Sequence, residues 1–233
     1  MPKITNEHYL LFLKENEIQL IEKETLGEWV KDLKNKKHPR KGSLEQSKSL
    51  LIALYYTGAR PSEIVDLTAE DVVQKKYLHQ WVYEIKLKTL KRGVSRSIPI
   101  PKTYLTQQFY EYTKKQFPKA FIFYSFRGML KNKVSWTRSK DMIVKENGEI
   151  RHEKFSDTKT REYIRKGKKV NDYIVQWTGY PAYFFRHHRF SYMSDKGASD
   201  NDIQFFKGSK SPASVEPYKH MSTQRKEKLA KYF

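Results

Sequence analysis

A chain of 233 residues is long enough for one substantial domain, and its 46 Lys and Arg residues against 26 Asp and Glu give a formal net charge of +20. That charge favours a nucleic acid as partner, although a genome rich in A and T also enriches a protein in lysine and tyrosine. The absence of cysteine excludes disulfides, thiolate zinc sites and cysteine nucleophiles, and no apolar run reaches the roughly 18 residues of a membrane helix.

The predicted elements begin with helices. Residues 7–20 (EHYLLFLKENEIQL) predict a short amphipathic helix. Thr25 and Glu28 have the spacing of a capping box before a second helix, EWVKDLKN. After a basic loop, Ser43 and Gln46 have the same spacing at the start of a buried helix that runs to Tyr56.

A junction between two helices follows. Gly58 suits the left-handed position after a helix end, and Pro61 suits the first turn of the next helix. Arg60 stands between them. An arginine fixed in this way suits the binding of phosphoryl oxygens, because its planar fork is always charged and donates to two oxygens at once. The alternative is an arginine that caps a helix end or pairs with Glu63.

The pattern after Asp71 changes to strands. Residues 81–88 alternate and are rich in β-formers, and residues 95–100 return as a second strand, so a β-hairpin with a lysine-rich tip is expected. The remaining expectations are a helix over 103–116, a short apolar stretch over 121–126, a polar surface insertion within 131–172, and helices over 186–197, 201–208 and 221–233. The fold class predicted is mainly α with a small antiparallel β-sheet (α+β).

Two blocks and a tyrosine resemble one family. TGARPSEIVDL (57–67) resembles the first arginine motif of the tyrosine recombinases, the family of phage integrases and Xer-type recombinases. YFFRHHRFSYMSDKG (183–197) resembles the H-x-x-R-H block of that family. From Gly197 the chain keeps the family's spacing to Gly208 and to the nucleophilic tyrosine, Tyr218. The order of the blocks is also that of the family.

The resemblance implies a mainly helical catalytic domain that breaks double-stranded DNA without a metal or other cofactor. Arg60 and Arg186 would clamp the scissile phosphate, and Glu63 would orient Arg60. Tyr218 would attack, forming a 3′-phosphotyrosyl link and releasing a 5′-hydroxyl. The hairpin lysine of the family, which protonates that leaving oxygen, corresponds best to Lys88.

Further residues follow from the same resemblance. Lys86 and Lys91 are alternatives to Lys88, and His187 matches the structural histidine of the family, with His188 at the surface or facing DNA. Adjacent helical positions diverge, so the two histidines do not predict a metal site. The DNA-binding side chains expected are Lys86, Lys91, Arg92, Lys207 and Lys210.

The sequence departs from the family at two positions. Tyr183 stands where most members have the first histidine of the second block, and Ser209 stands where most have histidine or tryptophan. Both are expected in the catalytic site, and Lys207 or Lys210 is an alternative occupant of the Ser209 position. Tyrosine is a poor proton acceptor at neutral pH, so either the arginine field alone activates Tyr218 or the reaction is slow. The Y-x-x-R pattern and the FRHHRFS sequence of this block are similar to those of archaeal members of the family, whether chromosomal, viral or plasmid-borne.

The expected organisation is a short helical extension over 1–20 and a catalytic domain over 21–233, whose tail helix covers 221–233. Most family members carry a preceding domain that closes a clamp around DNA. Here we expect a catalytic domain alone, a chain from which that domain was removed, or a shrunken clamp. No signal-peptide pattern opens the chain, so we expect it in the cytoplasm, associated with the nucleoid when bound to DNA.

The assembly and activity predicted also follow the family. The tail is expected to dock on a neighbour in a homotetramer on DNA, with a monomer or weak oligomer in its absence. The alternative is a tail that folds back or frays. The leading hypothesis is a site-specific recombinase or integrase. A type IB topoisomerase-like strand transferase and a non-catalytic DNA-binding relative are the alternatives.

Overall fold

The computed structural model describes residues 22–88, 95–146, 149–164, 168–209 and 212–215, with residues 128–169 described through their backbone alone. The predicted helices 7–20 and 221–233, the hairpin tip and Tyr218 lie outside these ranges. The described chain is mainly helical with a three-stranded antiparallel sheet, which confirms the predicted fold class.

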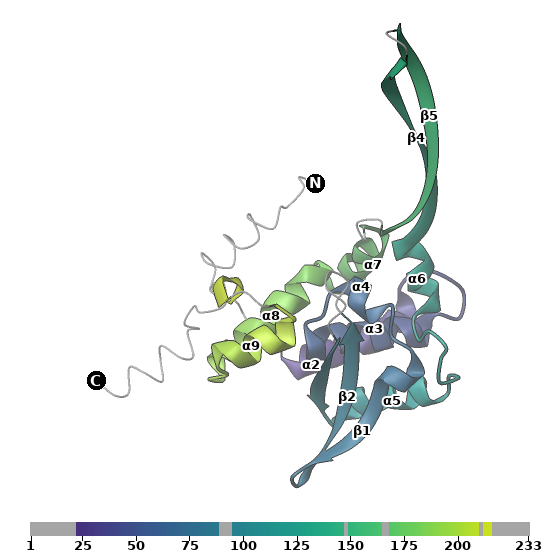
Figure 1. Ribbon diagram of the computed structural model, residues 1–233. Coiled ribbons are helices and arrows are strands. Elements are labelled where there is room, and N and C mark those ends of the chain that lie inside the picture. Colours follow the sequence, from purple (N-terminus) through teal and green to yellow (C-terminus); the bar gives the residue numbers. More distant parts are fainter. Residues whose placement is uncertain (1–21, 89–94, 147–148, 165–167, 210–211, 216–233) are drawn as a thin grey trace.

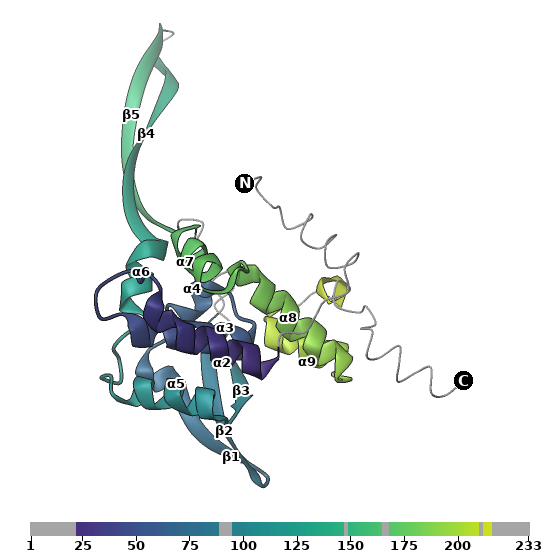
Figure 2. The same cartoon turned by 180° about the vertical axis from the view of Figure 1, so that it is seen from behind.

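Helix α3 lies at the centre of the fold, where α2, α5 and α8 pack against it (Figures 1 and 2). Leucine, isoleucine and tyrosine occupy all faces of α3, so it is buried along almost its whole length. The helices are α2 (Lys23–Asp32), α3 (Leu44–Thr57), α4 (Pro61–Ile64), α5 (Tyr104–Lys114), α6 (Tyr124–Leu130), α7 (Lys168–Thr178), α8 (Ala182–Asp195) and α9 (Asp200–Lys207), with short 3₁₀ turns at Leu33–Asn35, Ala69–Asp71 and Pro212–Ser214 (η3).

Two of the predicted caps are wrong. Helix α2 begins at Lys23, so Thr25 lies inside it, because the Leu26 backbone N–H already donates to the Glu22 carbonyl (3.3 Å). Ser43 does precede α3, but its hydroxyl donates to the Arg40 carbonyl (2.8 Å) instead of capping the helix. The buried Gln46 side chain accepts from the Ser125 backbone (3.1 Å), so it serves tertiary packing.

The sheet has the order β1 (Val72–Tyr77), β2 (Gln80–Lys88), β3 (Ser95–Pro101). The β2–β3 hairpin confirms the prediction, whereas β1 was not predicted because its lysine-rich second half hides the alternation. Leu87 pairs with Arg96, and both are buried. Neighbouring positions of a strand point to opposite faces, so the exposed Lys86 and Lys88 lie on the other face of the sheet.

The predicted insertion is a long two-stranded arm. Strands β4 (Lys131–Glu146) and β5 (Glu149–Ile164) pair antiparallel along their whole length and stand out from the body, away from the three-stranded sheet (Figures 1 and 2). The arm lies within the predicted range of 131–172. Helix α7 already begins at Lys168, and burial of Val170, Ile174 and Trp177 ties it to the core.

Gly58 ends α3 in the left-handed region, with φ of 59°, as predicted. A Cβ at this position would lie 2.9 Å from the Cβ of Arg189 on α8, so the residue must be small as well as left-handed. The close approach brings the end of α3 against α8. This contact places Arg60, two residues later, beside the second arginine block.

We expect Gly58→Ala to destabilise the protein by more than the roughly 1–2 kcal/mol that a left-handed backbone alone costs a residue with a Cβ. The matched control is Gly197→Ala, where φ is also positive (84°) but nothing lies within 4 Å of the added Cβ. Urea unfolding of both variants measures the difference. Equal losses would show that contact with Arg189 is unimportant.

No described helix has the length and apolar character needed to cross a membrane.

Candidate active site

Arg60 occupies the residue before α4, in an extended conformation. Its backbone N–H donates to Glu63 Oε2 (2.8 Å), and its Nη1 lies 3.5 Å from Glu63 Oε1. The Arg60 side chain is nevertheless 43% exposed, whereas that of Glu63 is 1% exposed. The pairing of Arg60 with Glu63 is therefore present, and it leaves the guanidinium accessible to a ligand.

Glu63 is held mainly by a second arginine. Both of its oxygens accept from Arg96 on β3, at 3.2 Å from Nη1 and 3.0 Å from Nη2, and both side chains are buried. Burial acts to raise the pKa of Glu63. The hydrogen bonds and charge of Arg96, the backbone hydrogen bond from Arg60 and the charge of Arg186 together outweigh it and hold that pKa below its usual value. Glu63 therefore stays ionised and fixes both arginines.

Arg96 was not among the predicted site residues. It also donates from Nε to the Phe206 carbonyl near the end of α9 (2.9 Å), so it links β3, α4 and α9. A signal was available in the sequence. Arg96 has the inward phase of Ile98 and Ile100 on the strand, and an arginine at a core-facing position needs a buried partner.

We expect Glu63→Gln to lower the free energy of unfolding by about 3 kcal/mol, because Arg96 then remains buried without a countercharge. The control is Glu45→Gln, which removes an exposed pair with Lys48 and should change stability little. Chemical unfolding at pH 7 checks both variants. An equal, small effect at the two positions would contradict the importance of the buried pair.

Arg186 lies on α8 with 1% of its surface exposed. Its Nη1 donates to the Gly58 carbonyl and its Nη2 to the Lys207 carbonyl, both at 2.8 Å. Its guanidinium carbon lies 4.8 Å from the ring centre of Phe190. Arg186 therefore fastens the end of α3, where the Arg60 junction begins, to the end of α9. The predicted residues Arg60, Arg186 and Lys207 come together here.

Lys207, the last residue of α9, lies within this group of cations. Its Nζ donates to the Ser214 carbonyl of η3. Burial first, and then the positive charges of Arg186 and Arg60, lower the pKa of Lys207 to about 8. Ser209 follows the left-handed cap Gly208, is partly buried, and donates its backbone N–H to the Gln204 carbonyl (3.1 Å).

Tyr183 and His187 lie on α8 around Arg186. Their ring centres are 4.7 Å apart in an edge-to-face contact, with Tyr183 partly buried and His187 buried. The expectation that His188 lies at the surface or faces DNA is wrong. His188 is 2% exposed and lies 5.2 Å from the ring centre of Tyr55, because α8 packs directly against α3.

The hairpin residues are described only in part. Lys88 is exposed at the end of β2, opposite Ser95, and Lys86 lies two residues earlier on the same face. Lys91, Arg92, Lys210 and Tyr218 lie outside the described residues. Among the residues that are described, no group of three or more His, Asp or Glu side chains is placed to hold a metal ion.

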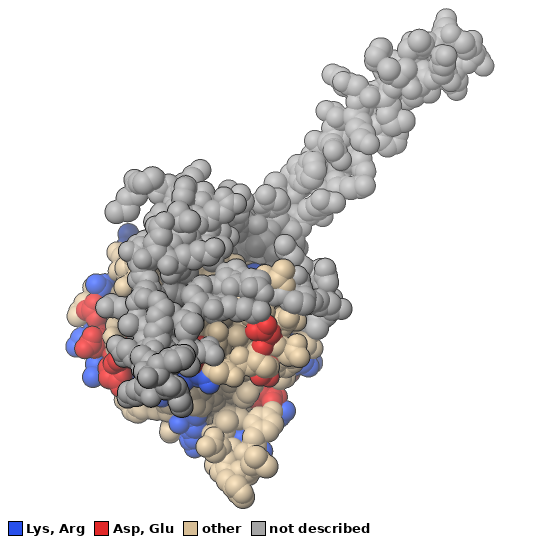
Figure 3. All heavy atoms as spheres, turned by 90° about the vertical axis from the view of Figure 1, so that its left-hand side faces the viewer, with Lys and Arg blue, Asp and Glu red and all other residues tan. Residues whose placement is uncertain are grey.

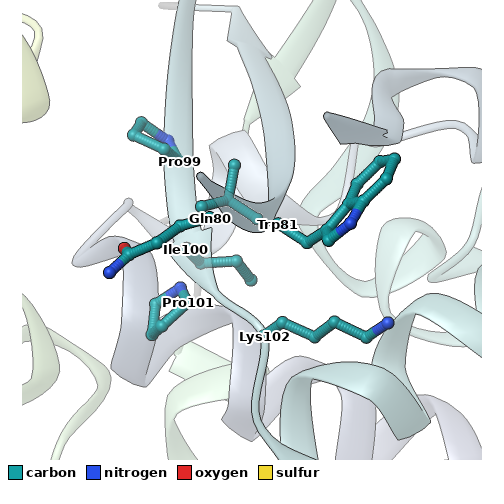
Figure 4. A pocket seen from close by; sticks show the side chains of 7 residues that line it. Gln80, Trp81, Pro99, Ile100, Pro101 and Lys102 are labelled. Carbon is teal, nitrogen blue, oxygen red and sulfur yellow. The ribbon is translucent and has the colours of Figure 1, made fainter. Parts of the chain in front are cut away.

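On the face seen from the α8–α9 side, the described Lys and Arg residues are interspersed with Asp and Glu (Figure 3). A hollow of about 390 Å³ lies at the end of the sheet where β2 starts and β3 ends, away from Lys88 (Figure 4). It is lined by Gln80, Trp81, Val82, Pro99, Ile100, Pro101 and Lys102.

Comparison with known proteins identifies the family. A profile of the phage integrase family matches residues 28–225, which is most of the chain, and the chain therefore belongs to that family. Members of this family of tyrosine recombinases are enzymes that cleave and rejoin DNA. No match was found among curated proteins.

Three solved structures are similar in fold. XerH site-specific recombinase in a post-cleavage complex with palindromic difH substrate is 16% identical, with a TM-score of 0.55, over 90% of this chain and 52% of that one. The pre-cleavage complex of XerH with difH substrate is 15% identical, with a TM-score of 0.53, over 91% of this chain and 54% of that one. XerA recombinase is 11% identical, with a TM-score of 0.54, over 93% of this chain and 64% of that one. The chain thus spans about half the length of XerH. At these identities the similarity establishes the fold.

Proposed function

We propose that this chain is the catalytic domain of a site-specific recombinase or integrase that cleaves and rejoins double-stranded DNA. The observation that carries the proposal is the fixed pair of Arg60 and Arg186. One arginine is tied to Gly58 and Lys207 by hydrogen bonds, and the other keeps an exposed guanidinium beside it. Donors fixed in advance are what a phosphoryl transition state requires.

In the proposed reaction, the Tyr218 oxygen attacks the scissile phosphorus and loses its proton to solvent water. A phosphorus–oxygen bond to the tyrosine forms, and the bond to the 5′-oxygen breaks. Lys88 gives that oxygen a proton, so the products are a 3′-phosphotyrosyl link and a 5′-hydroxyl. Arg60 and Arg186 neutralise the negative charge that develops on the non-bridging oxygens. Rejoining is the reverse reaction with a new 5′-hydroxyl.

We propose that the Tyr183 hydroxyl donates a hydrogen bond to the phosphate. His187 is proposed to hold the Tyr183 ring in place, since the two rings are in edge-to-face contact. Ser209 is proposed as a further polar neighbour. No metal or other cofactor takes part in this scheme. Tyr183 and the amino-acid sequence of the second block also motivate our proposal that the protein is an archaeal member of the family, whether chromosomal, viral or plasmid-borne.

The proposed DNA contacts and assembly complete this hypothesis. Lys86, Lys91, Arg92 and Lys210 are proposed to contact the DNA backbone. Residues 21–233 form the catalytic domain after an extension over 1–20, and the tail 221–233 docks on a neighbour in a homotetramer. The site of action is the cytoplasm, on the nucleoid.

Covalent trapping tests the proposed function. The protein is incubated with nicked suicide duplexes that carry candidate sites, with EDTA present, and the products are separated on a denaturing gel. We expect a shifted protein–DNA band. Binding without a band on any substrate would favour a non-catalytic relative. Relaxation of supercoiled DNA regardless of sequence would favour a topoisomerase-like enzyme.

A further inference from the structure

The end of helix α9 is where the arginines of the candidate site meet the segment that leads to Tyr218. The Phe206 carbonyl accepts from Arg96, and the Lys207 carbonyl accepts from Arg186. The Lys207 ammonium reaches in the other direction, to the Ser214 carbonyl. Ser214 precedes Tyr218 by four residues in the sequence. One lysine thus connects the arginine cluster to the chain that carries the proposed nucleophile.

Charged residues of several elements lie around the end of α9. Helix α4 and the residue before it contribute Glu63 and Arg60, strand β3 contributes Arg96, and helix α8 contributes Arg186. Arg189 of α8 also lies 6.0 Å from the ring centre of Phe206.

Among the described residues of this group, the carboxylate of Glu63 is already engaged by Arg96 and by Arg60. The positive charges of Arg186 and Arg60 both act on Lys207. Like charges that are close together in a partly buried site repel one another, and a bound anion relieves that repulsion.

We propose that Lys207 is a third ligand of the DNA phosphate that Arg60 and Arg186 bind, and that its ammonium exchanges the Ser214 carbonyl for a phosphate oxygen when DNA enters. This inference rests on the proposed function of the site. It assigns a specific contact to a residue that the sequence placed among the DNA-binding lysines and as an alternative occupant of the Ser209 position. The exchange also releases one tether of the segment that leads to Tyr218.

The proposal has a consequence for protons. In free protein the pKa of Lys207 is about 8, so at pH 9 most of this lysine is neutral. A phosphate oxygen beside the amine favours the ammonium and raises the pKa. DNA binding above pH 8 therefore takes up a proton, and affinity falls as pH rises through the free pKa toward the bound one. Below pH 7 the amine is charged in both states, and this contribution disappears.

The test is calorimetric titration of the full chain with a duplex at pH 9, in two buffers of different ionisation enthalpy, which reports proton uptake. We expect wild-type protein to take up about half to one proton more than Lys207→Arg, whose guanidinium stays charged. Lys207→Met should bind about tenfold more weakly at pH 7. The control is Lys31→Arg, an exposed lysine at the end of α2, which should keep the uptake of wild type.

Thermal melts of the variants separate loss of folding from loss of the contact. Equal proton uptake in wild type and folded Lys207→Arg, or no DNA binding at all, would overturn the inference. The proposed function is judged separately, by the covalent band. A band without the proton difference rejects only the role of Lys207, whereas the proton difference without a band keeps the phosphate contact and rejects the catalytic proposal.

Discussion

We expect Tyr218→Phe to abolish covalent attachment to DNA while leaving DNA affinity unchanged. The substitution removes only the hydroxyl oxygen that attacks phosphorus, so cleavage should fall by at least about a thousandfold. A denaturing gel with a suicide duplex measures the covalent product, and a mobility shift measures binding. This prediction rests on the spacing from Gly208 to Tyr218 in the sequence.

A matched control for this variant is available in the same chain. Tyr180→Phe removes the hydroxyl of a partly exposed tyrosine that stacks on Phe184 before α8. Cleavage should survive in that variant. A normal covalent band from Tyr218→Phe, or its loss in both variants, would assign the nucleophile elsewhere.

Arg186→Lys is expected to cut the cleavage rate by about a hundredfold or more, although the positive charge is kept. The guanidinium of Arg186 donates to two carbonyls on different elements, and a single ammonium cannot span them in the same geometry. Single-turnover cleavage of a suicide duplex at saturating protein gives the rate. Unfolding in urea is measured alongside, because Arg186 also joins the ends of α3 and α9.

Arg60→Lys separates the effect of the arginine pair on cleavage from its effect on stability. The Arg60 side chain is 43% exposed and its contact with Glu63 is supplementary to that of Arg96, so this variant should keep its stability. Its cleavage rate should still fall strongly. Unimpaired cleavage by Arg60→Lys and Arg186→Lys would contradict the proposal that the two guanidinium groups bind the reacting phosphate.

The sequence predicted the parts of the site that depend on local signals. Gly58 and Pro61 mark the Arg60 junction, because left-handed glycine and helix-starting proline are local properties of the backbone. Gly208 marks the end of α9 in the same way. The identity of the two arginine blocks came from resemblance to the family, and the structure brings Arg60 and Arg186 to one place.

The parts of the candidate site that the sequence did not predict depend on contacts between distant segments. The inward phase of Arg96 on its strand indicates that it needs a buried partner, but no local pattern identifies Glu63, 33 residues away, as that partner. His188 is buried because α8 packs on α3. The polar residues next to it in the sequence give no indication of this packing. The Lys207–Ser214 contact likewise appears only once α9 and η3 are placed.

The most direct test of the proposed chemistry is to identify the bond in a trapped complex. The covalent product is digested with trypsin and nuclease, and mass spectrometry locates the residue that carries the nucleotide, while kinase labelling of the released strand tests for a free 5′-hydroxyl. We expect a nucleotide joined through its 3′-phosphate to Tyr218, formed equally well in EDTA. Attachment to another residue, a 5′-phosphate link, or a strict need for a divalent metal would contradict the proposed mechanism.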